Sequence, residues 1–540
     1  MSSENGNNTG ESVAAESAQP SVGSTKLAIL LSMAMFVLVV DTSIMNVSIA
    51  SVSRDLHTTV SNVQAVIAIE ALVSAAFILI GGKVADLIGR KRGYALGLIG
   101  YGLGAMSMVL SDTMLPIVIF WAIFGGLGAS LLLPSMQALI HGNFEGLALK
   151  RAYALVGAST SIAIAVGPLL GGFLTTYLSW RVGFLLEVVI ILIVFSGFRL
   201  IKDVPFTGKR EIDLVGAALS AVGMGGIVLS ILVWQEGGSR VLLLMAIGAV
   251  AMAGLIYWLR KRKREGKPML LDPGLFVSKL FRRGISCQML QQISLGGLMI
   301  VMPIFLQMVL EYNSMQAGLS ITPLSISMFL AAVAAGKTAG KFRPASVIRL
   351  GFLLATLGTI ALILLVPRIA SGWYLFVPFV IIGSGLGLMV SQLNNYTLSP
   401  IEEERVAEAA GVNSAAGSFG MSFGLAFAGA IMLAMLAFTF TFMSNQSTVL
   451  SPDQKGQVAT ALHEDAEVMS NTQLNQLLAS QPAPVQQEII RINTEARPIA
   501  LQVGLFVPLF AGLIGLVLSF GMMKLPDPVA SSSAEEMILG

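Results

Sequence analysis

Long apolar segments separated by short polar ones are the dominant pattern of this 540-residue chain. A helix that crosses a membrane needs about 20 mostly apolar residues. Segments of about that length lie at residues 27–50, 61–82, 94–110, 114–139, 152–177, 183–200, 214–235, 240–259, 285–309, 317–336, 347–367, 373–394, 411–440 and 499–523. The pattern therefore predicts an all-α integral membrane protein with about fourteen transmembrane helices.

The composition agrees with this reading. Charged residues make up 12% of the chain, about half the share found in soluble proteins, and the 56 glycines suit helices that pack closely in lipid. Residues 1–25 are polar and are expected to be a disordered N-terminus. The apolar segment after Lys26 continues past Asp41, so it reads as a first span rather than a signal peptide.

The basic residues are distributed unevenly between the two sides of the predicted membrane. With a cytoplasmic N-terminus, 26 of the 33 Lys and Arg residues fall on the cytoplasmic side. Cytoplasmic loops carry such an excess, and one miscounted span would reverse the alternation after it. We therefore expect a multi-pass protein of the cell (plasma or inner) membrane with both termini cytoplasmic, including the tail at 526–540.

A cluster of nine Lys and Arg residues lies between Arg260 and Arg283. Such a cluster could contact nucleic acid, but between two membrane helices it is better explained as an anchor on anionic lipids. We expect membrane lipids as partners and no nucleic acid. The polar segment at 441–497 lies outside on this count, and either a short amphipathic cap or an unstructured loop is consistent with its weak periodicity.

The string GGKVADLIGRKRG follows the second predicted span. It resembles the signature between the second and third spans of the major facilitator superfamily. In that family the signature forms a conformational latch at the cytoplasmic gate. The resemblance implies this role for Gly82, Asp86, Gly89, Arg90 and Arg92, with Asp86 as the charge contact between helices and Arg90 as its partner or dipole anchor.

A second string, GPLLGG, lies in the fifth predicted span. Proline removes a backbone donor and can kink the helix, and glycines allow close packing there. The string resembles the exporter-associated motif of drug:proton antiporters, in which the kinked helix seals or hinges the path. The matching residues are Gly167, Pro168, Gly171 and Gly172.

The first span carries Asp41, Thr42 and Asn46, which resemble the first-helix motif of the fourteen-span branch; the proline that ends the family motif is Ala50 here. The resemblance implies a major facilitator fold of two six-helix bundles with two extra central helices. The expected parts are an N-terminal bundle at 26–201, two linker helices at 202–263, and a C-terminal bundle at 264–525 that includes the external segment at 441–497. An echo of the latch at 334–344 fits an internal repeat of the two halves.

The chain also departs from the family pattern. Ala122 stands where the family has a fourth-span arginine that is tied to proton coupling, and Glu70 and Glu187 replace a tyrosine and an asparagine. Together with Asp41 they are three acids within predicted spans. Buried acids in a membrane usually line a path or meet a partner, so each is a candidate for proton coupling or substrate binding. A structural pairing with a neighbouring helix is the alternative for each.

Uncharged amides form a second set of candidates. Gln288, Gln291 and Gln292 lie in the ninth span, and Asn46 lies in the first. They could hydrogen-bond a substrate in a cavity, or they could join helices. No catalytic residues, cofactor or metal site are expected, since the three histidines are far apart and Cys287 is the single cysteine. An enzyme is therefore not expected.

These features favour a secondary active transporter. The first hypothesis is proton-coupled efflux of small amphipathic or cationic compounds by alternating access, with small molecules and protons as partners and a monomer as the working unit. The alternative, raised by Ala122, is an exporter or facilitator of one metabolite or lipid that is not proton-coupled in the usual way. Substrate identity does not follow from the fold.

Overall fold

The computed structural model describes residues 25–144, 146–203, 213–233, 239–338, 341–401, 405–451, 455, 471–479 and 481–525. Within these residues fourteen helices are long and apolar enough to cross a membrane, and each overlaps one predicted span. The predicted all-α membrane fold is confirmed. The N-terminus before Thr25, residues 204–212 and the tail after Leu525 lie outside the described residues.

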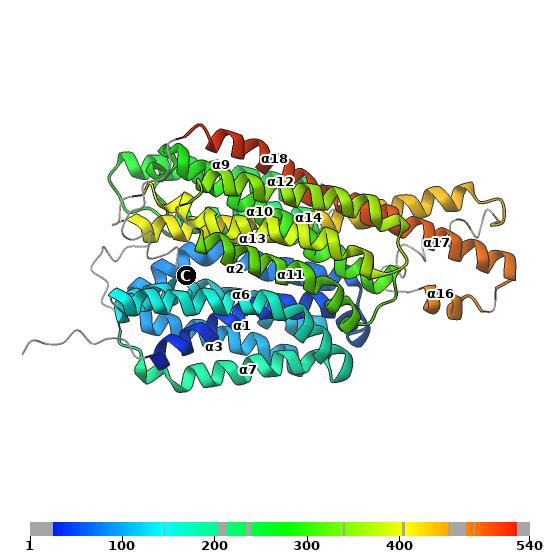
Figure 1. Cartoon of the computed structure of the whole chain (residues 1–540), viewed down its shortest axis with the longest axis horizontal. Helices are drawn as coiled ribbons and strands as arrows, with labels where there is room; N and C mark the ends of the chain where they lie inside the picture. The colour runs from blue at the N-terminus through cyan, green and yellow to red at the C-terminus, as the bar shows by residue number, and fades with distance from the viewer. Residues whose placement is uncertain are drawn as a thin grey trace, which may run out of the picture.

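The helices run roughly parallel to one long axis (Figure 1). α1 begins and α18 ends at one end of the bundle, which we call the terminal end, and α16 projects from the other, which we call the loop end. The first three spans are α1 (Thr25–Asp55), α2 (Val60–Ile88) and α3 (Arg90–Leu110). The fourth span consists of three consecutive elements: α4 (Met114–Pro116), the π-helical η1 (Ile117–Gly125) and α5 (Gly126–Asn143). The fifth and sixth spans are α6 (Gly146–Tyr177) and α7 (Trp180–Ser196).

Two further helices separate this set from the next six spans. They are α8 (Leu214–Leu232) and α9 (Ser239–Arg264). The remaining spans are α10 (Lys279–Ile304) with the π-helical η5 (Phe305–Val309), α11 (Ser314–Lys337), α12 (Pro344–Leu365), α13 (Phe376–Leu398), α14 (Val406–Gln446), and α17 (Ala483–Gly504) continued by α18 (Phe506–Met522). The short α16 is Asn471–Leu477.

The two six-helix sets pack in the same pattern. In the first set α1 packs on α6 and α7, α2 packs on α5, and α3 packs on α5 and α7. In the second set α10 packs on α14 and α18, α11 packs on α13, and α12 packs on α13 and α18. Each of these contacts in one set therefore has a counterpart in the other, which is the arrangement of a structural repeat.

The two sets meet along two seams. α6 packs on α11, and α2 packs on α14. At the first seam a side chain on Gly318 would collide with the carbonyl oxygen of Pro168, so the helix backbones touch as closely as small residues permit. α8 packs on both α2 and α14, and so the extra helix pair covers the second seam rather than standing apart from the two sets.

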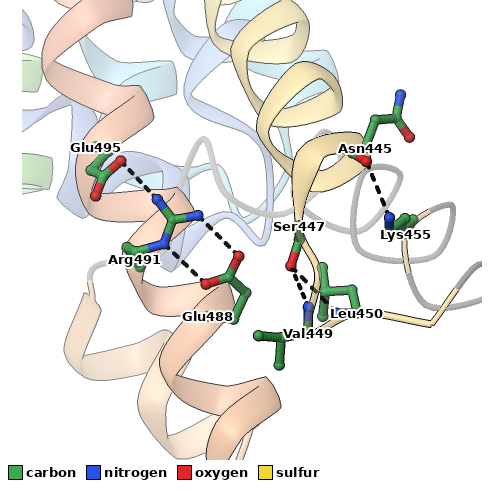
Figure 2. Close-up of polar contacts among 8 residues, drawn as sticks. All are labelled: Asn445, Ser447, Val449, Leu450, Lys455, Glu488, Arg491 and Glu495. Carbon is green, nitrogen blue, oxygen red and sulfur yellow. Dashed lines mark hydrogen bonds and ion pairs between the residues drawn. The ribbon is translucent and has the colours of Figure 1, made fainter.

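At the loop end two helices are longer than the predicted spans. α14 continues to Gln446 and α17 begins at Ala483, although the apolar segments end at 440 and begin at 499. Arg491 joins Glu488 (2.9 Å) and Glu495 (3.0 Å) along the projecting part of α17 (Figure 2), and such pairs stabilise a solvated helix. Residues 441–446, 471–477 and 483–497 of the segment are helical, and residues 447–451 are not; residues 452–454, 456–470 and 480 are not described.

Candidate functional site

Asp41 lies at the middle of α1 with 2% of its surface exposed. Its Oδ2 atom accepts hydrogen bonds from the hydroxyl of Tyr101 on α3 and from Nε1 of Trp121 on η1, the latter at 3.3 Å. Its Oδ1 atom has no hydrogen-bond partner among the described residues. Both observed donors are neutral, so the carboxyl group is held in place without a cation.

The other two intramembrane acids lie near Asp41. Glu187 on α7 has 1% of its surface exposed, and neither of its carboxyl oxygens has a hydrogen-bond partner in the described part of the chain. Glu70 on α2 is partly exposed. Asp41 acts electrostatically on both, and all three carboxyl groups act on Tyr101. The three predicted acids, called the acid cluster below, therefore lie within electrostatic range of one phenol, and in the described residues that phenol hydrogen-bonds Asp41.

Ala122 follows Trp121, the η1 residue whose indole donates to Asp41. It is fully buried on η1, next to Trp121. The family resemblance leads one to expect an arginine at position 122, and the chain has an alanine there. The hydrogen-bond donor that η1 offers to Asp41 is therefore the uncharged indole of Trp121.

The latch residues lie at the terminal end, where α2 ends and α3 begins. Asp86 accepts a hydrogen bond from Nε of Arg90 at 3.0 Å, which bridges the two helix ends. Gly89 between the helices has a φ of +101°, a backbone conformation that favours glycine. Gly82 faces Pro134 on α5, and Arg92 is exposed.

The backbone of the same turn is tied to the end of the first helix set. Lys91 donates its backbone N–H to Asp203 at 3.0 Å and its Nζ to the carbonyl of Ile201 at 2.6 Å. Its ammonium group also lies 4.7 Å from the ring centre of Phe198. The latch turn is therefore fastened to the segment that follows α7.

The exporter-type motif packs α6 against two helices. A side chain at Gly167 would meet Ser43 of α1, and one at Gly171 would meet Ile44 of α1. One at Gly172 would meet Ser314 of α11. Pro168 lies within α6 and its carbonyl faces Gly318. The motif thus joins the α1 residues that follow Asp41 to the seam between the two sets.

Several contacts join the two sets at the loop end. Gln307 donates to the backbone carbonyl of Val47 at 3.1 Å. The hydroxyl groups of Ser51 and Ser314 are 3.4 Å apart, and the hydroxyl of Thr176 accepts from the backbone N–H of Met315 at 2.9 Å. The two sets are therefore held together at this end by polar contacts between α1, α6 and the start of α11.

The predicted amides lie in both sets. Asn46 is buried on α1, one turn past Asp41, and neither amide atom has a partner among the described residues. Gln288, Gln291 and Gln292 share one face of α10 on the other side of the seam. The structure does not bring these three together with the acid cluster by any hydrogen bond in the described residues.

The loop between α9 and α10 carries a charge cluster that the sequence did not single out. Asp272 accepts from Lys263 (2.9 Å), the backbone of Gly274 (2.7 Å) and Arg405 (2.7 Å), and its own N–H donates to Glu408 (2.7 Å). Burial alone would raise the pKa of Asp272, but these hydrogen bonds and the charge of Arg405 hold it below its usual value. The loop is thereby fixed to the start of α14.

At the loop end Glu311 holds α16 in place. Its carboxylate accepts from the backbone N–H of Thr472 at 3.0 Å and from the hydroxyl of Thr472 at 2.6 Å. Glu311 itself has a φ of +54°, a strained conformation for a residue other than glycine. Because Ser314 at the seam lies three residues further on, this contact connects α16 to the place where the two sets meet.

Sequence reasoning missed the partners of the predicted acids. Tyr101 and Trp121 are 60 and 80 residues from Asp41 along the chain. An aromatic residue in each of two otherwise apolar spans is the only local signal, and it is weak because most such residues only pack. Among the described residues no group of three or more His, Cys, Asp or Glu could hold a metal ion.

Comparison with known proteins identifies relatives. The family model of the Major Facilitator Superfamily matches residues 31–425. The chain is 30% identical over 394 residues to the puromycin resistance protein pur8 of Streptomyces alboniger (71% of this chain, 76% of that protein). It is 24% identical over 470 residues to the Streptomyces coelicolor protein named "Probable actinorhodin transporter" (85% and 79%).

Further comparisons agree in family and fold. The multidrug efflux pump LfrA of Mycolicibacterium smegmatis is 25% identical over 446 residues (82% of this chain, 86% of that protein). Among solved structures, an inward-facing bacterial homologue of the human lysosomal transporter Spinster matches with a TM-score of 0.59 and 11% identity (94% of this chain, 98% of that chain). At that identity the likeness concerns the fold alone.

Proposed function

Because the chain belongs to the Major Facilitator Superfamily, we propose that it is a secondary active transporter that exports small amphipathic or cationic compounds in exchange for protons. It works as a monomer, and its two six-helix sets rock against each other around a central site. The relatives that are named for puromycin resistance and multidrug efflux support the class of substrate and the direction of transport.

The terminal end faces the cytoplasm in this proposal. The support is the excess of Lys and Arg in the loops at that end, including the basic segment between Arg260 and Arg283. The moving parts are the N-terminal bundle at 26–201 and the C-terminal bundle at 264–525. The linker helices at 202–263 cover the seam between them. The latch turn around Asp86 and Arg90 controls the cytoplasmic gate, and the α6 motif from Gly167 to Gly172 controls the outer one.

The acid cluster carries the proposal. Asp41 and Glu187 are almost fully buried, and no cation bonds either of them in the described part of the chain. A charged carboxylate is costly in such surroundings, whereas a protonated one is not. In this proposal Asp41, whose carboxyl group is held in place by Tyr101 and Trp121, carries the exchanged proton. The charges of Glu70 and Glu187 influence when Asp41 releases that proton. Binding of a cationic compound nearby favours the charged carboxylate and expels the proton.

A second function is favoured by one observation. Ala122 is fully buried at the position of the coupling arginine of the family. In this alternative the chain exports or facilitates the movement of one metabolite or lipid and is not proton-coupled in the usual way. The two functions differ in whether a pH gradient drives movement of the compound.

The deciding experiment uses purified protein in liposomes that contain tetraphenylphosphonium or puromycin. An inwardly directed proton gradient is imposed across protein oriented with its terminal end inside, and efflux is followed. Efflux that accelerates with the gradient and is lost in Asp41→Asn supports the exchange. Efflux that is equally fast without the gradient in both proteins supports a facilitator.

A further inference from the structure

The polar chemistry of the two helix sets differs. The three intramembrane acids all belong to the first set, on α1, α2 and α7. In the second set, α10 from Gly284 onward, α13, and α14 from Gly411 onward contain no Asp, Glu, Lys or Arg. These helices contain carboxamides instead. The amides of interest are Gln288, Gln291 and Gln292 on α10, Asn394 and Asn395 on α13, and Asn413 on α14.

Contacts between the three helices bring these amides to one place. Asn413 donates from Nδ2 to Oδ1 of Asn394 at 2.7 Å, which joins α14 to α13. A side chain at Gly417, one turn after Asn413, would lie 3.4 Å from Nε2 of Gln288 and 3.7 Å from Gln292. α10 also packs on α13. We call these six side chains the amide cluster; all of them lie in the terminal half of their helices.

Most of these amides are not used to join helices. Neither polar atom of Gln291 has a hydrogen-bond partner among the described residues, although its side chain is fully buried. The same holds within the described chain for Oε1 of Gln292, Oδ1 of Asn395 and Oδ1 of Asn413. A buried polar group without a partner is destabilising, and several of them in one place call for a ligand or water.

Gln392 shows the contrasting case on the same helix as Asn394. It is buried, as Gln291 and Asn413 are, yet its amide donates to the hydroxyl of Ser391 at 3.1 Å and to the carbonyl of Ala335 on α11 at 3.5 Å. An amide that only joins helices has partners of this kind. Gln291, which is buried on α10, has no such partner in the described residues.

The cluster also reaches the surface. Asn394 is exposed, Asn395 is partly exposed and Gln291 is fully buried. The amides therefore extend from solvent at the terminal end into the core of the second set. A carboxamide both donates and accepts, and it can present either group by turning over. Such a lining suits molecules that differ in where they carry carbonyl and hydroxyl groups.

We propose that the amide cluster is a binding subsite for the uncharged hydrogen-bonding groups of the exported compound, namely carbonyls, hydroxyls and amides. The inference rests on the proposed function and deepens it. The second helix set recognises the neutral polar part of the substrate, while the acid cluster of the first set responds to its charge. Compounds that have a cation but no hydrogen-bonding group gain nothing from the amides.

The test measures equilibrium binding to the purified full-length protein, without a proton gradient. Two cationic probes are compared: puromycin, which has hydroxyl and amide groups, and tetraphenylphosphonium, which has none. Gln291→Leu removes a buried amide at similar volume, and Gln392→Leu is the matched control. We expect Gln291→Leu to weaken puromycin binding about tenfold, since a lost hydrogen bond to a buried group is of that order, and to leave tetraphenylphosphonium unchanged.

Thermal unfolding of the same variants separates binding from structure. If Gln291 has no partner in the empty protein, Gln291→Leu leaves Tm unchanged or raises it, whereas Gln392→Leu lowers Tm. The subsite is overturned by any of three results. The wild type does not bind puromycin, Gln291→Leu binds puromycin as tightly as the wild type, or Gln291→Leu loses affinity equally for both probes. If both probes bind as expected but neither moves with a proton gradient, the subsite stands and the proposed exchange fails.

Discussion

The hydroxyl of Tyr101 on α3 donates a hydrogen bond to the carboxylate of Asp41 on α1. This bond joins the acid at the centre of the proposed proton exchange to a helix that packs on α5 and α7. It stabilises the charged form of the carboxyl group, which has to arise once in each exchange cycle. The phenol is therefore a positioning residue for Asp41.

Tyr101→Phe should slow proton-driven efflux about tenfold or more. A hydrogen bond to a charged group contributes about 1.5–3 kcal/mol, and its loss makes the charged state of Asp41 rarer. The rate is measured in liposomes with tetraphenylphosphonium. Tyr94→Phe is the control, because the buried hydroxyl of Tyr94 on the same helix has no hydrogen-bond partner within the described residues. Equal rates in the two variants would remove Tyr101 from the mechanism.

A disulfide across the loop end should stop transport reversibly. The hydroxyl oxygens of Ser51 and Ser314 are 3.4 Å apart across the seam, close enough for a Ser51→Cys, Ser314→Cys pair to be oxidised. Cys287 is buried and does not compete. Alternating access requires this end to open, so the oxidised protein should be inactive and regain activity with reductant. Each single variant is the control, and full activity of the oxidised pair contradicts an outer gate here.

The contact of Glu311 with Thr472 should protect the segment around α16. Glu311→Gln weakens both hydrogen bonds to Thr472, so we expect faster cleavage by trypsin at Lys455, the one Lys or Arg between Arg405 and Arg491. Cleavage is followed by gel electrophoresis. Glu495→Gln, which removes an exposed charge on α17, is the control and should be cleaved at the wild-type rate. Unchanged cleavage of Glu311→Gln means that the contact does not hold the segment.

The charge cluster of Asp272 should make a pH-dependent contribution to stability. Its pKa is lower in the folded protein than in the unfolded chain, so the contribution is complete above the unfolded pKa, roughly 4, and is lost as the pH falls through the lower folded value. Asp272→Asn should therefore lower Tm at pH 7 and lower it less at pH 3, where the carboxyl group is charged for a smaller part of the time. A Tm difference that is the same at both pH values contradicts this account.

Much of the fold could be predicted from the sequence, because each span is a local property of about 20 residues. The helix ends were less accurate at α14 and α17, since the helices continue beyond their apolar parts into water, where hydropathy carries no signal. The packing of α8 on both α2 and α14 could not be predicted, because it depends on contacts between distant segments.

The candidate site was predictable only in part. Asp41, Glu70 and Glu187 stand out because acids are rare in spans, but their nearness to Tyr101 depends on how four helices, α1, α2, α3 and α7, are arranged. The amide face of α10 follows from the spacing of Gln288, Gln291 and Gln292. The position of Asn413 beside this face does not follow from the sequence, because Asn413 belongs to a different helix, α14.

The most direct test of the account measures protons released when a cation binds. Purified protein in a weakly buffered detergent solution near neutral pH is titrated with tetraphenylphosphonium, and the pH is followed with an indicator dye. If Asp41 carries the exchanged proton, the wild type releases protons in proportion to the tetraphenylphosphonium bound, and Asp41→Asn binds it without releasing any from this site. Equal release by the two proteins, or binding by the wild type with no release, would contradict a proton carried by Asp41.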